Sequence, residues 1–288
     1  MTDTLVCPAC GSDNSKAVPI PFTPSNRAVQ VWHQCGMCHA FFSSEPYQFE
    51  AEVAHTQQMA WGQSNTGTQL NIYKRRVYGA ALDLLAGHIS GSAAILDVGC
   101  SYGGFMLEAQ ARGYQVIGCD IVAEAVQYVR SLGLEAHISP SVAAFSRHVQ
   151  KTFDAVTCID VNCYWHNQPE ELHAIHAILR PQGYLLMRVI DKSWLFGLGV
   201  RVARLHLSTG KRLMRAAVND HRHSMPMKSL LRLLKKQGYR VLYASPKGAL
   251  HSDQARRAVR VAFQLGAFIH RVSGLYLAPG ALILAQKT

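Results

Sequence analysis

Hydrophobic residues recur along this chain with two spacings, and each spacing predicts a different kind of element. Between Gln69 and His88 apolar residues fall near every third or fourth position, as on one face of a helix: Leu70, Tyr73, Val77, Ala81, Leu84 and Leu85. Short continuous apolar runs follow this segment, and such runs are typical of buried strands. We therefore expect helices and strands to alternate along most of the chain.

Residues 93–121 predict the most regular unit of the chain. A buried strand from Ile95 to Val98 leads into a glycine turn, and a helix then spans about Gly104 to Arg112 with Gly113 as its C-cap. A second strand runs from Tyr114 to Cys119. These elements form a β-α-β unit.

The turn between the first strand and the helix has the features of a ligand-binding loop. Gly99 and Gly103 let the backbone pass close to a ligand, and the N-terminus of the following helix favours a carboxylate. Asp120 closes the second strand 23 residues after Asp97, where its carboxylate can accept hydrogen bonds from both hydroxyls of a ribose. A dinucleotide enzyme would also carry such a turn, but its G-x-G-x-x-G pattern differs from the D-x-G-x-x-x-G found in this chain.

The sequence ILDVGCSYGGF resembles the first signature of class I S-adenosylmethionine-dependent methyltransferases, whose usual form is acidic-x-Gly-x-Gly-x-Gly. The resemblance implies that Asp97 and the loop from Gly99 to Gly103 hold the methionine end of the cofactor, and that Asp120 holds its ribose. Ser101 replaces the central glycine and fits there if its φ angle is negative. The expected cofactor-binding set is Asp97, Gly99, Ser101, Gly103, Asp120, Ile121 and Asp160.

The order of the later elements extends the resemblance from about Ile72 to Ile190. A strand in KTFDAVTCIDV ends at Asp160, and a helix in PEELHAIHAIL and a turn and strand in RPQGYLLMRVI follow, as in the family's strand, helix, L-x-P-G-G, strand passage. Many relatives place an acidic residue after the third strand to contact the adenine amine. The stretch LEAHISPSVAAF offers only His137, Ser139 and Ser141 there, so the sequence assigns no adenine contact.

The C-terminal third predicts a helix from about Pro226 to Gln237, then Gly238 as a cap, and a strand. This part resembles the subgroup that contains the ubiquinone-pathway O-methyltransferases, and GALILAQK would then be the last, antiparallel strand. The expected fold class is α/β: a Rossmann-like seven-stranded sheet of six parallel strands and one antiparallel strand, with helices on both faces.

Two C-x-x-C pairs near the N-terminus predict a small zinc ribbon. Cys7 and Cys10 form the first pair, and Cys35 and Cys38 form the second, so that four thiolates can complete a tetrahedral shell. Such a closed site has no open position for water, and its metal would be structural. Two disulfides are the alternative, which a reducing cytosol disfavours.

Charge and composition bear on location and partners. The 29 Lys and Arg residues outnumber the 18 Asp and Glu residues, giving a net charge of +11, which suits an anionic partner. The chain shows neither a targeting segment nor an apolar run long enough to span a bilayer, so we expect a cytoplasmic protein. We divide it into a ribbon (1–45), a linker or cap (46–68) and a methyltransferase domain (69–288) with insertions at about 191–220 and 247–279.

Both insertions combine apolar and basic residues. Such helices can lie on an anionic membrane surface, which would make the protein membrane-associated, or their apolar stripes can roof the acceptor pocket. Both interpretations favour a large or greasy acceptor.

We expect O-methylation of a small organic, glycan or lipid-like acceptor, which requires a base. His223, His221 and His166 follow predicted strands or precede a helix near the acceptor end, and imidazole suits this task. An RNA methyltransferase is an alternative, although DVNCYW lacks the N/D-P-P-aromatic signature of enzymes that methylate base amines. A further alternative is a non-catalytic scaffold with a decayed cofactor site.

Overall fold

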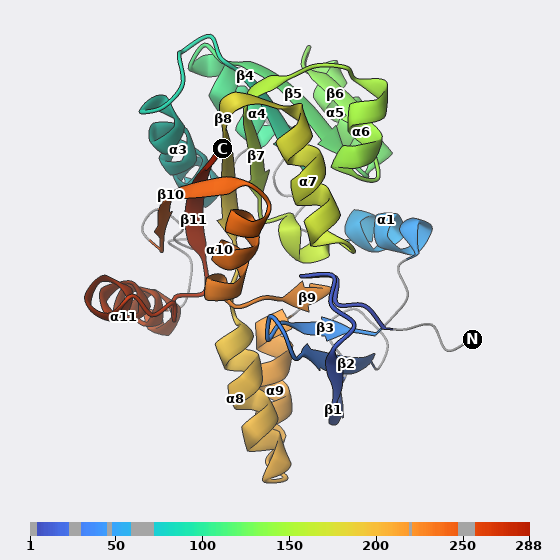
Figure 1. Cartoon of the computed structure of the whole chain (residues 1–288), viewed down its shortest axis with the longest axis vertical. Helices are drawn as coiled ribbons and strands as arrows, with labels where there is room; N and C mark the ends of the chain where they lie inside the picture. The colour runs from blue at the N-terminus through green and yellow to red at the C-terminus, as the bar shows by residue number, and fades with distance from the viewer. Residues whose placement is uncertain (1–4, 23–29, 45–47, 59–71, 219–220, 247–256) are drawn as a thin grey trace.

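A computed structural model describes residues 5–22, 30–44, 48–58, 72–218, 221–246 and 257–288. Its main feature is a seven-stranded sheet in the order β10-β11-β8-β7-β4-β5-β6 (Figure 1). The strands are β4 (Ala94–Val98), β5 (Gln115–Asp120), β6 (Glu135–Ile138), β7 (Phe153–Ile159), β8 (Leu179–Val189), β10 (Tyr239–Ser245) and β11 (Ala281–Lys287).

The direction of the strands confirms the expected fold class. The strands β4 to β8 pair in parallel, whereas β11 lies antiparallel to both of its neighbours, β8 and β10. Six strands therefore run one way and the last strand of the chain runs the other. The register β4 to β5 pairs Asp97 with Gly118 and Val98 with Cys119, so that the two strands end side by side.

Helices cover both faces of this sheet. One face packs against α6 (Val142–His148), α7 (Gln168–Ile178) and α10 (Met227–Lys236), and the other against α3 (Ile72–Ala86), α4 (Gly104–Ala111) and α11 (Arg257–Ser273). The helix α5 (Ala123–Ser131) packs beside α4. Neighbouring residues on β4 serve opposite faces, because Leu96 joins the first core and Ile95 the second. Burying each of these side chains stabilises the fold by about 1.5–3 kcal/mol.

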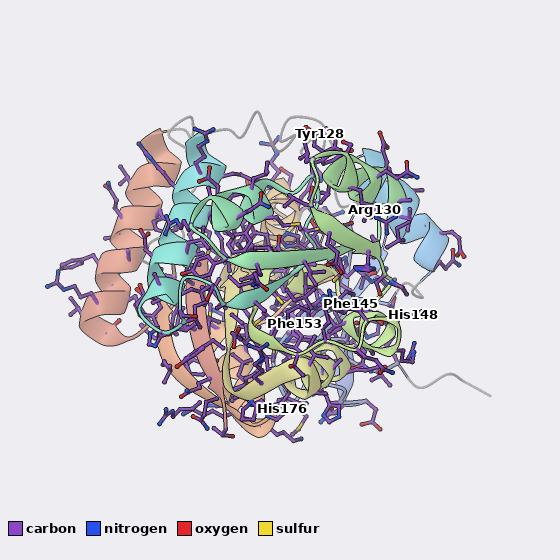
Figure 2. All side chains as sticks on the ribbon, turned by 90° about the horizontal axis from the view of Figure 1, so that it is seen from above. Tyr128, Arg130, Phe145, His148, Phe153 and His176 are labelled. Atoms are coloured by element: carbon purple, nitrogen blue, oxygen red, sulfur yellow. The ribbon has the colours of Figure 1, made fainter. Side chains whose placement is uncertain are left out.

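An aromatic pair at the edge of the first core helps to hold α6 on the sheet. The rings of Phe145, from α6, and Phe153, from β7, have centroids 6.3 Å apart (Figure 2). Both side chains are buried. The pair fixes the segment that precedes α6, which later forms one wall of the site.

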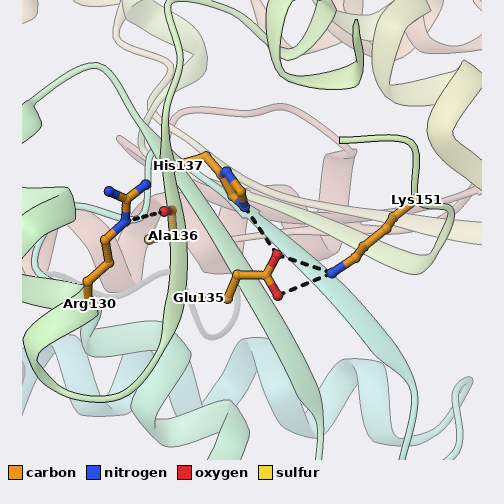
Figure 3. A network of polar contacts seen from close by, with 5 residues as sticks. All are labelled: Arg130, Glu135, Ala136, His137 and Lys151. Carbon is orange, nitrogen blue, oxygen red and sulfur yellow. Dashed lines mark hydrogen bonds and ion pairs between the residues drawn. The ribbon is translucent and has the colours of Figure 1, made fainter. Parts of the chain in front are cut away.

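The exposed edge of the sheet at β6 is closed by side chains. Arg130 Nε donates a 2.8 Å hydrogen bond to the backbone carbonyl of Ala136, and Glu135 accepts from His137 Nε2 and Lys151 Nζ at 3.1 Å (Figure 3). Charged residues and a satisfied edge carbonyl discourage pairing with another strand.

The N-terminal segment forms a second sheet, and it does so with a strand from the distant C-terminal third. Its strands are β1 (Ser15–Phe22), β2 (Gln30–Cys35), β3 (Phe41–Ser43) and β9 (His223–Ser224), all antiparallel. Phe41 pairs with Ser224, and Phe42 with His223. The cysteine-containing segment is thus completed by a piece of the methyltransferase part of the chain.

The insertion at 191–220 contains a helical hairpin, α8 (Ser193–Arg204) and α9 (Ser208–Val218), which projects from the lower end of the molecule (Figure 1). Phe196 of α8 is fully buried and joins the hairpin to the second sheet, because its ring centroid lies 5.2 Å from that of Trp32 and 4.5 Å from that of Phe41.

Two other segments differ from expectation or lie partly outside the description. The segment 46–68, expected to be irregular, contains the helix α1 (Phe49–Gln58), and residues 59–68 lie outside the described residues. In the insertion at 247–279, residues 247–256 lie outside them, and α11 begins at Arg257. None of the described helices combines the length and the apolar character that crossing a bilayer requires.

Candidate active site

A cavity of about 570 Å³ lies at the carboxyl ends of β4, β5 and β7, where the first two parallel strands meet the third. Open α/β sheets bind their ligands at this edge. Of the expected cofactor residues, the structure brings six to the cavity wall: Asp97, Gly99, Ser101, Asp120, Ile121 and Asp160. Gly103 is not among the described residues that line it.

The backbone of the glycine turn is held against β5. The N–H groups of Gly99 and Cys100 both donate to the carbonyl of Cys119, at 2.8 and 3.1 Å. Gly99 has a φ of 73°, and a Cβ there would meet Val161 Cγ2 at 2.8 Å, so only glycine fits without movement. Gly103, with a φ of 76°, is the N-cap of α4. Its contribution is therefore to the turn and not to the cavity wall.

Ser101 adopts a left-handed conformation, with a φ of 49°. The expectation that a serine fits only with a negative φ is therefore wrong. Its N–H donates a 2.8 Å hydrogen bond to Oδ2 of Asp120, which stabilises the conformation that a non-glycine residue otherwise resists. Ser101 lines the cavity while its backbone stays in the glycine-like geometry.

Asp120 lies at the end of β5 and is held by two backbone groups. Its Oδ2 accepts from Ser101 N–H, and its Oδ1 accepts from Val122 N–H at 2.9 Å. Burial raises the pKa of this carboxyl, while the backbone hydrogen bonds lower it. Each oxygen retains a lone pair, so the carboxylate is oriented and can still accept from the hydroxyls of a ligand.

Asp97 is almost fully buried at the end of β4. Its Oδ1 accepts a 2.8 Å hydrogen bond from Thr157 Oγ1 of β7. Burial raises the pKa of Asp97 to about 7, and the Thr157 hydrogen bond and the charge of Lys74 oppose this rise. A cationic ligand group beside Asp97 would favour its charged form.

Lys74 is a cavity residue that the sequence did not reveal. It comes from the first turn of α3, about twenty residues before β4, and is half-buried. Burial lowers the pKa of Lys74, while the charges of Asp160 and Asp97 raise it. The methionine-end region therefore contains a cation as well as carboxylates. The only sequence signal is a lysine inside an amphipathic pattern, and that signal is common on solvated helices.

Asp160 lines the cavity at the end of β7 and forms an ion pair with Arg188 of β8, with Arg188 Nη1 donating to both carboxylate oxygens. The Arg188 side chain is fully buried, and Asp160 has a φ of 60°. The sequence predicted Asp160 but missed its partner, although an arginine inside the apolar run YLLMRVI was a visible signal.

The wall beyond Asp120 is formed by residues 139–142 together with Glu171 of α7. Glu171 Oε2 accepts a 2.8 Å hydrogen bond from Val142 N–H, and burial raises the pKa of Glu171 to about 7. Ser139 and Ser141 also line this wall, whereas His137 is not among the described lining residues. The acidic residue that the sequence lacked after the third strand is supplied here by a helix some thirty residues later.

The opposite wall carries the aromatic and histidine residues. Tyr164, Trp165 and His166 follow β7, through the 3₁₀ turn Asn162–Tyr164, and His221 precedes β9. The ring of His221 stands edge-on to that of Tyr164, with centroids 5.7 Å apart. His166 is exposed to the cavity and to solvent, and burial lowers its pKa below the usual value.

The structure separates His223 from the other two histidines. Its side chain is 1% exposed, it is not among the described residues that line the cavity, and its backbone belongs to β9. Burial lowers the pKa of His223 to about 4. Its position in the second sheet explains the difference from expectation, because alternate residues of a strand face opposite sides and only His221 turns toward the cavity.

The four cysteines of the two C-x-x-C pairs converge. Their Sγ atoms all lie within 4.8 Å of one another, with 3.8 Å between Cys7 and Cys38 and 3.6 Å between Cys10 and Cys35. A tetrahedral zinc site with zinc–sulfur distances near 2.3 Å separates its sulfurs by about 3.8 Å. None of the eight cysteines, all of which are described, is in a disulfide.

The cysteine cluster touches the wall of the cavity through the backbone. Pro8 O accepts a 2.8 Å hydrogen bond from Gln168 N–H, and Ala9 O accepts from Gln168 Nε2 at 3.4 Å. Gln168 also accepts from Asn162 Nδ2 at 3.0 Å. On the other side, Ser43 N–H donates to Arg222 O. The cluster thus supports both segments that present Tyr164 and His221.

A parallel sheet with helices on both faces, a glycine turn and strand-ending carboxylates at a cavity defines a Rossmann-like nucleotide-binding protein. Comparison with known proteins narrows this class. The family described as "Methyltransferase domain" matches residues 70–244, which is more than half of the chain. The chain belongs to this family of methyltransferase domains.

Individual relatives agree with the family. The ubiquinone biosynthesis O-methyltransferase of Erwinia tasmaniensis is 29% identical over 134 residues, covering 43% of this chain and 55% of that protein. The protein of the same name from Xanthomonas oryzae pv. oryzae is 32% identical over 107 residues, covering 35% and 44%. The chain thus spans about half the length of these relatives.

Solved structures share the fold at low sequence identity. A chain in the complex between the Haloferax volcanii Trm112 methyltransferase activator and a methyltransferase is similar with a TM-score of 0.52 and 15% identity, covering 84% of this chain and 98% of that one. The magnesium protoporphyrin IX methyltransferase of Synechocystis PCC 6803, with bound S-adenosylhomocysteine, has a TM-score of 0.51 and 12% identity, covering 79% and 93%.

Proposed function

We propose that this protein transfers a methyl group from S-adenosylmethionine to a hydroxyl of a small organic acceptor. The observation that carries the proposal is the oriented carboxylate of Asp120, held by Ser101 and Val122 N–H at the mouth of a glycine turn, in a cavity large enough for a nucleoside and a second molecule. The family match and the relatives named O-methyltransferases support the same reaction.

The cavity wall suits each end of the cofactor. Asp97 and Lys74 offer opposite charges for the ammonium and carboxylate of the methionine end, next to the backbone of Gly99 and Ser101. Asp120 would accept hydrogen bonds from the ribose hydroxyls. Glu171 and the segment 139–142 would face the adenine, whose amine can donate to the carboxyl of Glu171.

The acceptor would occupy the wall formed by Tyr164, Trp165, His166, Lys192, Ala216 and His221. This wall mixes aromatic rings with imidazoles, so a flat, partly apolar molecule with a hydroxyl would fit it. We propose His221 or His166 as the base. His166 is a suitable proton acceptor because its lowered pKa keeps it neutral near pH 7.

When bound, S-adenosylmethionine supplies a methyl group on a positively charged sulfonium, which becomes a neutral thioether as the carbon–sulfur bond breaks and the carbon–oxygen bond forms. The chain's own contribution is to align the acceptor oxygen in line with that bond and to exclude water. The neutral imidazole receives the proton that the acceptor hydroxyl loses, so charge and atoms balance.

We also propose that the cysteine cluster binds one structural zinc ion. Four thiol ligands at tetrahedral spacing, with no water position, would stabilise a segment whose own core is small. The contacts of Pro8 and Ala9 with Gln168 would then place the support of the acceptor wall under the control of the metal.

Calorimetry with S-adenosylhomocysteine tests the cofactor half of this proposal. The Asp120→Ala variant should bind about 100-fold more weakly, because hydrogen bonds to a charged group contribute about 1.5–3 kcal/mol each. Glu124→Ala, which removes an exposed carboxylate in the first turn of α5, is the matched control and should bind normally. Absence of binding to the wild-type protein would support a decayed site instead.

Labelled methyl transfer into fractionated cell extract tests the acceptor half. We expect the label in a small-molecule or lipid fraction, and label in the RNA fraction would contradict the proposal. With an acceptor identified, His221→Ala or His166→Ala should lower the turnover rate by about 10²–10⁴-fold. His223→Gln is the control, since His223 lies outside the cavity.

A further inference from the structure

The projecting α8–α9 hairpin exposes apolar side chains at its tip. Leu205 is 70% exposed and Leu207 is 53% exposed, both in the short connection between the helices. The two helices are in close contact, because Gly199 and Gly210 lie where a Cβ would meet the opposite backbone at 2.9 Å or less. The tip is therefore carried on a closely packed hairpin that Phe196 anchors to the second sheet.

The helix α11 presents a second exposed apolar row. Val261, Leu265, Phe268 and Val272 are 54–71% exposed and follow the i, i+4, i+7, i+11 spacing of one helix face. The opposite face holds the helix to the protein, since Phe263 is 3% exposed. The outward row therefore makes no contribution to the core. No described residue of α11 lines the active-site cavity, so this helix does not roof the acceptor pocket as expected.

A groove joins these two features. It has a volume of about 460 Å³ and lies between α8 and the segment that follows α11, with Trp194 and Leu198 on one side and Leu275 and Leu277 on the other. All four of these side chains are at least one-third exposed. Figure 1 places α11 and the hairpin on the same lower part of the molecule. Together they form what we call the lower apolar surface.

The charges around the lower apolar surface have one sign. Neither α8, α9 nor α11 contains an Asp or Glu residue. Exposed cations flank the hairpin: Arg201, Arg204, Lys211, Arg212 and Arg215. Arg271 is exposed beside the row on α11. Large exposed apolar side chains surrounded by cations match the interface of an anionic bilayer, where side chains enter the acyl boundary and cations meet headgroups.

We infer that the lower apolar surface docks on an anionic phospholipid membrane. A second copy of the chain is a poorer occupant, because it would bring two cation-rich faces together. RNA would match the cations, but Leu205, Leu207 and Val272 have no favourable contact with a phosphate backbone. Insertion of these side chains into lipid removes them from water.

The position of the surface gives the inference a consequence for the substrate, and this step rests on the proposed methyl transfer. Lys192 and Ala216, at the base of the hairpin, line the active-site cavity. A docked hairpin would therefore hold the acceptor wall close to the bilayer. The acceptor class that fits is a hydroxyl-bearing molecule that partitions into the membrane.

Vesicle flotation tests the docking directly, without any acceptor. The wild-type protein should float with vesicles of phosphatidylcholine and phosphatidylglycerol and remain behind with phosphatidylcholine alone. Arg204→Glu with Lys211→Glu should weaken the partition by at least roughly 25-fold, at about fivefold for each cation removed. Leu205→Ser with Leu207→Ser, and Leu265→Ser with Phe268→Ser, should each weaken it by at least roughly tenfold.

The matched control is Arg147→Glu with Lys236→Glu. It changes the net charge equally, but these exposed residues end α6 and α10 at the opposite edge of the sheet, where β7 and β10 begin. Wild-type flotation that is equal with and without phosphatidylglycerol, or that is lost equally in the control, would overturn the inference. So would a wild-type dimer in sedimentation that the leucine variants convert to a monomer without any change in flotation. S-Adenosylhomocysteine binding, measured on the same samples, separates failure of docking from failure of the proposed methyl transfer.

Discussion

The carbonyl of Pro8 accepts a 2.8 Å hydrogen bond from the N–H of Gln168, the first residue of α7. The turn of the first cysteine pair thus satisfies a backbone donor at the start of the helix that carries Glu171 to the cavity. This relationship connects the N-terminal cysteine cluster with the proposed cofactor site and makes their stabilities interdependent.

Loss of the metal should therefore weaken cofactor binding as well as the ribbon. We expect one zinc per chain in the wild-type protein, and Cys35→Ser should lose it. Because the binding free energy of a structural zinc is folding free energy, the variant should show a lower melting temperature and weaker S-adenosylhomocysteine binding. Zinc content, thermal melting and calorimetry measure these effects. Asp13→Ala, an exposed residue of the same segment, should retain the metal.

The left-handed conformation of Ser101 leads to opposite expectations for two substitutions. Ser101→Gly should leave S-adenosylhomocysteine affinity unchanged and alter the free energy of unfolding by less than about 1 kcal/mol, since relief of strain and the gain in unfolded-state entropy oppose each other. Ser101→Val should destabilise the fold by about 1–3 kcal/mol, because a β-branched residue resists a positive φ. Urea unfolding of both variants distinguishes them. Equal stability of the glycine and valine variants would argue against this conformation.

The raised pKa of Asp97 predicts how stability depends on pH. With a folded pKa of about 7, Asp97 keeps a proton between about pH 4 and pH 7 that the unfolded chain has released. The folded state binds more protons in this window, so its stability falls as pH rises. We expect this group to lower the free energy of unfolding by up to about 4 kcal/mol between about pH 4 and pH 7.

Asp97→Asn tests this expectation, since asparagine does not titrate. Urea unfolding across the same window should show a shallower loss of stability in the variant than in the wild-type protein. Glu171, whose pKa burial also raises to about 7, contributes in the same direction and will leave a residual slope. Parallel pH profiles for the two proteins would show that Asp97 is charged in the ligand-free fold.

The ion pair between Asp160 and Arg188 should be far more sensitive than a surface pair. Asp160→Ala leaves the fully buried Arg188 without its carboxylate and should destabilise the protein by about 3–5 kcal/mol. Asp83→Ala removes the partner of Arg112 on the surface, where Asp83 is 72% exposed, and should cost less than about 1 kcal/mol. Chemical unfolding of the two variants gives the comparison, and similar losses would mean that Arg188 finds another partner.

Local patterns in the sequence determined the order of elements and most of their boundaries. The helix expected between Gln69 and His88 is α3, and the β-α-β unit around the glycine turn is β4, α4 and β5. These features depend on residues a few positions apart, whose periodicity and turn chemistry act over short distances. The spacing within each cysteine pair likewise depends on a single tight turn.

Only the tertiary structure decided which distant residues share the site. Glu171 reaches residues 139–142, Lys74 reaches the ends of β4 and β7, and Arg188 reaches Asp160 because parallel strands and their covering helices converge at one edge of the sheet. No local pattern carries that information. The apolar rows of α8 and α11 show the same limit: periodicity reveals that a helix has an apolar face, but only packing determines whether that face is covered by the core or left at the surface. The two-residue strand β9, which joins the ribbon to the methyltransferase domain, is too short for any periodicity, and it exists because β3 offers it an edge.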